Sequence, residues 1–245
     1  MKMLAFASRN FKEIIRDKLN LAFGIGFPLV LIFLLSAIQA NIPVDLFTID
    51  HLAPGIAVFG LSFIALFSGM LIAKDRSSAF MLRLFASPMQ SWDFILGYTL
   101  PILPLAIVQI MVTFFVAFFL GLAVTVNVLL TILVLIPVAL LFIGIGLLSG
   151  TLLNDKQVGG VCGALLTNLT AWLSGTWFDL DLVGGGFKAL ADALPFVHAV
   201  DAGRVALNGD YGAIFPDLWW VIGYAVLIMV IAILVFMHKM DSDEI

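Results

Sequence analysis

The chain has 245 residues, of which 62% are hydrophobic and only 11% are charged, and its formal net charge is −4. Soluble domains carry roughly 25% charged residues, so this chain cannot cover a water-exposed surface and is predicted to be an integral membrane protein. A single cysteine, Cys162, excludes an internal disulfide and a multi-cysteine metal site. The start, Met-Lys-Met followed by mixed charge, predicts no cleaved signal peptide.

Residues 1–20 interleave basic and apolar side chains at helical spacing, as in Lys12 and Arg16 beside Phe11 and Ile15. This pattern is typical of an amphipathic helix that lies in the membrane interface before the first span. An ordinary charged tail is the alternative interpretation.

Six stretches have the roughly 20 mostly apolar residues needed to cross a bilayer. They are residues 21–39, 52–73, 94–120, 128–153, 158–178 and 218–238. The predicted fold is therefore an all-α membrane protein with six transmembrane helices in one domain, residues 1–245. If the N-terminus is cytosolic, ten of the twelve basic residues are cytosolic: five in 1–20, three in 74–93, one in 154–157 and one after 238. The positive-inside rule thus predicts two cytosolic termini.

Two polar segments interrupt the spans. Residues 76–88 contain the helix-capping pair Ser77-Ser78 near their start and end at Pro88, which cannot continue a helix. They predict a short amphipathic helix of about three turns. A solvated connector is the alternative there. Residues 179–217 are too long for a turn and too apolar for a free loop, and Pro195 divides them. We expect short helices at 187–194 and 196–207 that re-enter the outer leaflet under protein cover.

Two features within the spans are candidates for a substrate cavity. Phe59, Phe63 and Phe67 follow one another at i+4 spacing, and Thr167 and Asn168 make the fifth predicted span the most polar. An amide in hydrocarbon must face protein or a water-filled cavity, because an unpartnered polar group there costs several kcal/mol. Both features have the alternative role of packing between helices.

Several kinds of chemistry lack their residues. No Gly-x-x-x-x-Gly-Lys-Ser/Thr loop is present, so another chain must hydrolyse any ATP. The six stretches contain no carboxylate of the kind that ion-coupled carriers place in the bilayer, apart from Asp93 next to their edge. An intramembrane protease would need Ser62 and a histidine at one depth, but His238 is at a helix end. We therefore expect no catalytic residue, no metal and no directly bound cofactor.

Two segments resemble the type-2 ATP-binding-cassette (ABC) export permeases. The first runs from Asp75-Arg76-Ser77-Ser78 to Ser87-Pro88 and continues to Trp92 and Leu96-Gly97-Tyr98, and it is similar to the cytosolic loop of that family. Ala79, Phe80 and Leu82 depart from the usual Gly, Thr and Glu. The second, Leu194-Pro195-Phe196-Val197-His198-Ala199, is similar to the outer segment of the same permeases.

The resemblance implies a permease subunit in the plasma membrane that exports an amphipathic or hydrophobic compound: a drug, a toxin or a lipid. Lipid-linked polysaccharide is the rival cargo, and an ion-coupled carrier or intramembrane protease is the rival class. ATP and Mg would bind two copies of a partner ATPase, and a second permease subunit would complete a homodimer or heterodimer, with no nucleic acid among the partners. The residues implied to contact the ATPase are Arg76, Phe80, Arg83, Leu84 and Pro88.

Overall fold

A computed structural model describes residues 2–78 and 91–241, and within these ranges all regular secondary structure is helical. The first half contains α1 (Lys2–Arg16), α2 (Lys18–Leu21), the π-helical segment η1 (Ala22–Gly26), α3 (Phe27–Gln39), α4 (Ile49–Arg76) and α6 (Ser91–Phe119). The second half contains α7 (Val126–Leu152), α8 (Asp155–Val158), the π-helical segment η2 (Gly159–Leu166), α9 (Thr167–Leu173), α10 (Leu180–Val183), α11 (Gly185–Ala193), α12 (Pro195–Asn208) and α13 (Ile214–Asp241).

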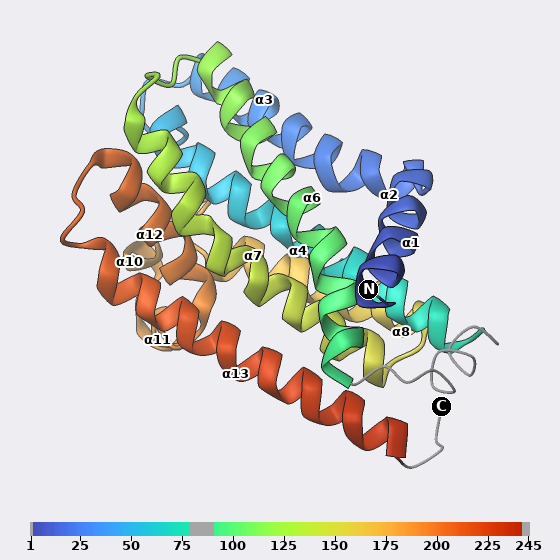
Figure 1. Cartoon of the computed structure of the whole chain (residues 1–245). Coiled ribbons are helices and arrows are strands. Elements are labelled where there is room, and N and C mark those ends of the chain that lie inside the picture. Colours follow the sequence, from blue (N-terminus) through green and yellow to red (C-terminus); the bar gives the residue numbers. More distant parts are fainter. Residues whose placement is uncertain (1, 79–90, 242–245) are drawn as a thin grey trace.

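Long helices run between two ends of the molecule (Figure 1). We call one end of the molecule the α1 end, because α1 lies there against the last turn of α4 and the first turns of α6. We call the opposite end, which contains α10, α11 and α12, the α12 end. Within the described ranges, five helical segments are long and apolar enough to cross a membrane: Lys18–Gln39, Ile49–Arg76, Trp92–Phe119, Val126–Leu152 and Ile214–Lys239. Each of them contains, to within a residue or two, one of the predicted spans.

The predicted span 158–178 is not among these five. Its residues lie in a helical run from α8 through η2 to α9 that ends at Leu173, five residues before the predicted limit. Gly175, with φ +67°, turns the chain away from the helical path, and a Cβ at Gly55 of α4 would collide with Thr176 in this turn. The structure thus supports five spanning helices, and the sixth span stays a prediction.

Helix α4 is the centre of the bundle. Four fifths of its spanning part (83%) are buried inside the chain, against 22% for α13 and 17% for Lys18–Gln39. It packs closely on α7, because a Cβ at Gly146 would collide with the carbonyl of Ala65 and one at Gly150 with the carbonyl of Gly69. Small residues allow such close backbone contact between membrane helices, where lipid supplies no hydrophobic driving force.

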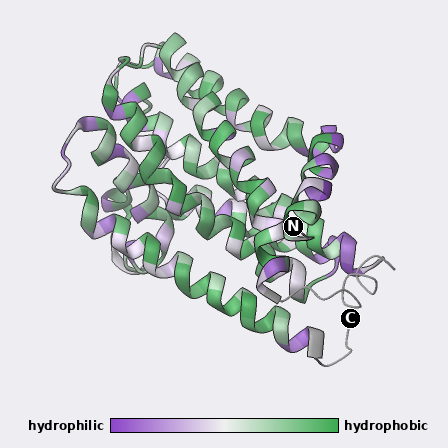
Figure 2. Ribbon diagram, viewed as in Figure 1, coloured by the Kyte–Doolittle hydropathy of each residue, from purple (hydrophilic) through white to green (hydrophobic). Residues whose placement is uncertain are grey.

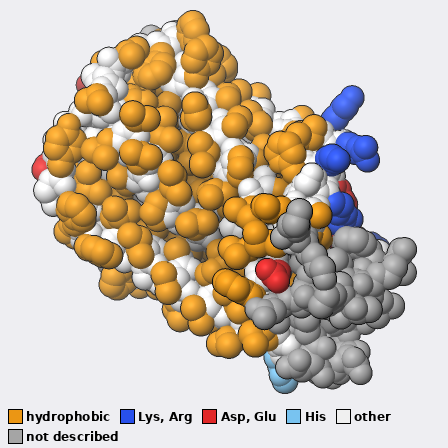
Figure 3. All heavy atoms as spheres, viewed as in Figure 1, with side chains coloured by type: hydrophobic (Ala, Val, Ile, Leu, Met, Phe, Trp, Pro, Cys, Tyr) orange, Lys and Arg blue, Asp and Glu red, His pale blue; other side chains and the backbone are white. Residues whose placement is uncertain are grey.

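The sides of the bundle are apolar. Figure 2 shows hydrophobic residues along the ribbons of the long helices, and Figure 3 shows hydrophobic side chains over the visible face, with charged side chains near its ends. Phe33, Phe115, Leu129, Trp219 and Leu234 are each at least half exposed. A water-soluble chain would not expose so continuous an apolar surface, so the hydrocarbon of a bilayer must cover it. The chain is a multi-pass membrane protein.

The segment between α9 and α13 is folded against the bundle. The two short helices predicted on either side of Pro195 correspond to α11 and α12, and α10 precedes them. Pro195 is the first residue of α12, where its missing N–H has no intrahelical partner to lose, and Gly209 ends that helix in the left-handed conformation (φ +82°). The predicted pair of Asp201 and Arg204 forms, with 3.3 Å between Oδ1 and Nη1.

Candidate functional site

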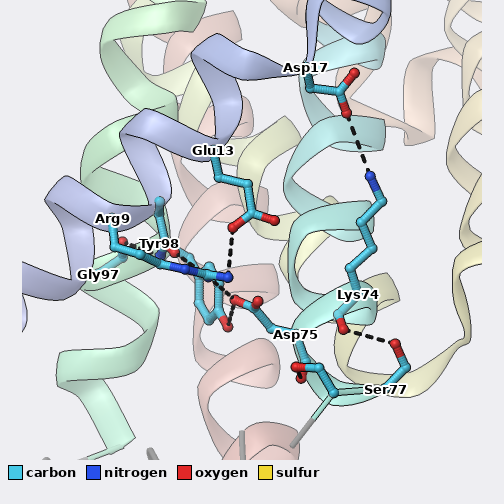
Figure 4. A network of polar contacts seen from close by, with 10 residues as sticks. Arg9, Glu13, Asp17, Lys74, Asp75, Ser77, Gly97 and Tyr98 are labelled. Atoms are coloured by element: carbon cyan, nitrogen blue, oxygen red, sulfur yellow. Dashed lines mark hydrogen bonds and ion pairs between the residues drawn. The ribbon is translucent and has the colours of Figure 1, made fainter. Parts of the chain in front are cut away.

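Asp75, in the last turn of α4, is a carboxylate with only 2% of its surface exposed. Its Oδ2 lies 2.6 Å from Arg9 Nη1 of α1 and accepts a hydrogen bond of 2.9 Å from the Tyr98 hydroxyl of α6 (Figure 4). Burying a carboxylate is unfavourable unless the charge is paired and hydrogen-bonded. One side chain therefore holds three helices together at the α1 end.

Arg9 is the cation of this network. Its Nη2 contacts Glu13 at 2.7 Å and its Nη1 donates to the side-chain oxygen of Asn10 at 2.9 Å. Burial acts to lower the pKa of Arg9, but the hydrogen bond and the negative charge of Asp75 outweigh it, so the pKa is raised. The guanidinium therefore stays charged, as the buried Asp75 requires.

Helix α1 is fixed to α6 by shape as well as by charge. The Asn10 amide donates to the Gly97 carbonyl at 3.0 Å, and the Phe6 ring meets the Tyr98 ring edge-on with 4.9 Å between centroids. A Cβ at Gly97 would collide with Phe6, so glycine is needed where the two helices touch. Helix α1 thus packs on the segment Leu96-Gly97-Tyr98 of α6, which carries part of the family resemblance described above.

A second contact ties α4 to the start of the first spanning segment. Lys74 Nζ lies 3.5 Å from Asp17 Oδ2, and Asp17 caps α2 by accepting the backbone N–H of Asn20 at 3.2 Å (Figure 4). Consecutive residues Lys74 and Asp75 therefore hold the two ends of the bend between α1 and α2. The last turn of α4 is therefore linked to both α1 and the start of α2.

Arg76, predicted to contact an ATPase, binds within its own chain. Its Nη1 donates to the carbonyls of Gly150 (2.9 Å) and Leu153 (3.3 Å) at the end of α7, where carbonyls lack helical partners. It joins α4 to α7. The other predicted ATPase contacts in the coupling helix 76–88, namely Phe80, Arg83, Leu84 and Pro88, lie outside the described residues.

Phe59, Phe63 and Phe67 are at most 9% exposed. Phe63 meets the rings of Phe59 and Phe27 with centroids 5.7 and 5.5 Å apart, and Phe59 also meets Trp177 at 5.5 Å. In a single chain this stripe packs α4 against the first spanning segment and the turn after α9.

Thr167 and Asn168 differ from the phenylalanines in their surroundings. The Thr167 hydroxyl donates to the Cys162 carbonyl at 3.1 Å, and the Asn168 amide donates to the Ala164 carbonyl at 2.8 Å. Asn168 is exposed, on a helix surface with Leu165 and Trp172, which are both more than half exposed. The predicted cavity residues therefore do not line one common surface within a single chain.

The α12 end carries a second polar cluster around an open cavity of about 360 Å³. His198 of α12 contacts Asp217 Oδ1 of α13 through Nδ1 (2.7 Å) and the Asp192 carbonyl of α11 through Nε2 (2.9 Å). The ring thus lies between a carboxylate of α13 and a backbone carbonyl of α11, both of which are hydrogen-bond acceptors, and it joins three helices.

Arg204 closes the other side of this cavity. It donates to the carbonyls of Gly175 (2.8 Å) and His51 (3.2 Å) as well as to Asp201. Burial lowers the pKa of Arg204, and it raises the pKa of Asp201 even though the positive charge of Arg204 opposes that rise. In the part of the chain that the structure describes, no group of three or more His, Cys, Asp or Glu side chains is arranged to hold a metal ion.

In the sequence, Asp75 stood out only as part of a motif, and its partners Arg9 and Tyr98 were not identified. The signal available in the sequence was a carboxylate directly at the end of a long apolar run, where it must be either solvated or paired.

Comparison with known families gives one match: residues 1–208 fit a family model described as "ABC-2 type transporter". The matched region runs from α1 to the end of α12 and so includes the Asp75 network and the His198 and Arg204 side chains. A comparison with curated proteins gave no match.

Proposed function

The chain belongs to the ABC-2 type transporter family, and from this premise we propose that it is the permease subunit of an exporter driven by ATP hydrolysis on two separate ATPase subunits. The single observation that carries the proposal is the Asp75 network. It joins α1, α4 and α6 directly beside the segment that the family resemblance identifies as the docking loop.

The network suits the transmission of force from that loop. Lys74, Asp75 and Arg76 are consecutive, and they contact α2, α1 with α6, and α7 respectively. A push on the end of α4 would therefore reach four other helical elements through polar contacts. Of these contacts, those of Asp75 are shielded from water, where electrostatic interactions are strong. In this proposal the α1 end faces the cytosol of the cell, in agreement with the ten basic residues assigned there.

The exposed Asn168 surface supports a second permease subunit. An amide facing lipid is costly even when its nitrogen donates to its own helix, because hydrocarbon offers its oxygen no hydrogen-bond donor. A second copy, or a homologous subunit, would cover this surface with Leu165 and Trp172. We propose that the substrate cavity forms between the two subunits, with Thr167 and Asn168 at its wall.

The proposed cargo is an amphipathic or hydrophobic compound such as a drug, a toxin or a lipid, because the proposed cavity wall is apolar with sparse amide and hydroxyl groups. Lipid-linked polysaccharide would favour a continuous aromatic-lined channel. The stripe of Phe59, Phe63 and Phe67 is buried by packing within the single chain, so it does not line such a channel there. The protease alternative receives no support, since the Ser62 hydroxyl is buried and donates to the Phe59 carbonyl at 2.7 Å.

Copurification followed by reconstitution tests the proposal. An ATPase subunit should copurify with the wild-type chain, and Arg83→Glu in the docking loop should weaken that capture. Asp75→Asn should leave capture intact but reduce transport per ATP hydrolysed, because docking would no longer move α1 and α6 together. ATP-dependent transport by the chain alone, without any ATPase subunit, would refute the proposal.

A further inference from the structure

Helix α1 presents two surfaces that the Asp75 network does not use. One is apolar: Leu4, Phe11 and Ile15 are 61, 44 and 51% exposed, and they lie within a narrow sector of the helix. Leu19 of α2 (68%) and Phe23 of η1 (52%) continue this exposed apolar surface onto the first spanning segment. The hydrocarbon boundary of the bilayer therefore follows α1.

The other surface is cationic. Lys12, Arg16 and Lys18 are exposed, and none of them forms an ion pair with the described residues. We call these three residues the basic rim. Figure 3 shows basic side chains projecting from this corner of the molecule.

The two carboxylates of this corner are paired within the chain. Glu13 contacts Arg9 at 2.7 Å, and Asp17 contacts Lys74 at 3.5 Å, so both are engaged with the network inside the corner (Figure 4). Both carboxylates thus have a basic partner within the chain, whereas Lys12, Arg16 and Lys18 have no acidic partner among the described residues.

Because the three exposed cations lack acidic partners and lie beside exposed apolar side chains, we infer that the basic rim binds the headgroups of anionic phospholipids. The adjacent apolar side chains place the rim at the level of the lipid phosphates, where long Lys and Arg side chains extend from hydrocarbon toward charge. Alternation of exposed apolar and basic residues on one helix fits a lipid surface better than a protein groove. The inference does not depend on the proposed transport function, because it needs only a membrane.

Each basic residue near an anionic surface strengthens binding by about fivefold at moderate salt, so the complete rim should favour anionic over zwitterionic lipid by up to about a hundredfold. High salt should reduce this preference, because the rim is exposed to screening.

The full chain in nanodiscs provides the test. Discs of phosphatidylcholine, with or without phosphatidylglycerol, are compared by hydrogen exchange of residues 2–21 and by mass spectrometry of the lipids that stay bound. In the wild-type chain, phosphatidylglycerol should slow exchange in α1 and should be retained preferentially. Lys12→Gln/Arg16→Gln/Lys18→Gln should remove both effects while exchange in α4 and α13 stays unchanged.

Two control variants separate charge from position. Lys156→Gln removes an exposed cation of the same end outside the rim and should keep the preference, as should the charge-conserving Lys12→Arg/Lys18→Arg. Equal exchange of α1 in both discs, or a preference that survives the triple substitution, would overturn the inference. So would a triple variant that releases an ATPase subunit while its lipid preference stays intact, since the rim would then be a protein-docking surface.

Discussion

The α1 end and the α12 end both hold charged side chains, but they hold them differently. At the α1 end, Asp75 is 2% exposed and its partners come from two other helices. At the α12 end, Asp201 has 42% of its side chain exposed and its charged partner, Arg204, is three residues away on the same helix. A buried shared charge makes a joint between helices that resists separation, because breaking it leaves a charge without water or a partner. At the α12 end, Arg204 also donates to carbonyls of two other elements, but the carboxylate of its pair keeps access to water, so breaking that pair should cost less.

The largest effect should come from breaking the buried pair. Arg9→Met leaves the Asp75 carboxylate with only the Tyr98 hydroxyl, and we expect a loss of about 3 kcal/mol of stability, the low end for buried pairs because Arg9 is partly exposed. Unfolding of the purified chain in detergent measures it. The double variant Arg9→Met/Asp75→Leu should recover most of the loss, since no charge is then left buried. A double variant as unstable as Arg9→Met would contradict this account of the joint.

Arg204→Met should cost less, about 2 kcal/mol, although it removes three hydrogen bonds at once. Its partner Asp201 can be hydrated in the open cavity, so no fully buried charge is left behind. Arg204→Lys is the matched control: it keeps the charge but cannot reach three acceptors and should recover only part of the stability. A larger loss for Arg204→Met than for Arg9→Met would reverse the order of the two ends.

Two tyrosines give the closest comparison between the two ends, because the hydroxyl of each donates one hydrogen bond. Tyr98→Phe removes a bond to a buried carboxylate and should cost about 1.5 kcal/mol, while Tyr224→Phe removes an exposed bond to the Ala193 carbonyl and should cost about 0.5 kcal/mol. The same unfolding measurement applies to both. Equal losses would show that burial does not distinguish the two ends.

The smallest effect should be a pH dependence at the α12 end. Burial raises the pKa of Asp201 above its ordinary value of 3.8. A raised pKa in the folded chain means that Asp201 contributes stability below its unfolded pKa and that this contribution is lost as pH rises through the folded pKa. Asp201→Asn should therefore flatten the acid side of the stability profile relative to wild type. A difference between the two proteins that stays unchanged as the pH rises from 3.8 to neutrality would contradict it.

Local patterns predicted the helices well. The range 52–73 lies inside α4, and 128–153 extends only one residue beyond α7, because a long apolar run without charges has no stable alternative to a helix in a bilayer. The predicted span 158–178 matched the structure less well, because the helix ends at Leu173. The sequence does not reveal that the chain turns at Gly175 and packs Thr176 on Gly55.

The candidate site was only partly predictable. Arg76 belongs to a motif that indicates docking, yet its guanidinium binds carbonyls of α7, whose last turn is more than 70 residues away in the chain. Asn168 was expected to pack or to line a cavity, and only the folded chain shows that its surface is exposed.

The sequence by itself determined the membrane environment, the spanning helices and the concentration of basic residues near particular helix ends, because hydropathy and length act locally along the chain. Only the tertiary structure decided which side chains contact Asp75. Its contacts with Arg9 and Tyr98 depend on how closely α1 approaches α6 at Gly97 and α4 approaches α7 at Gly146, and such distances between helices follow from the packing of many side chains together.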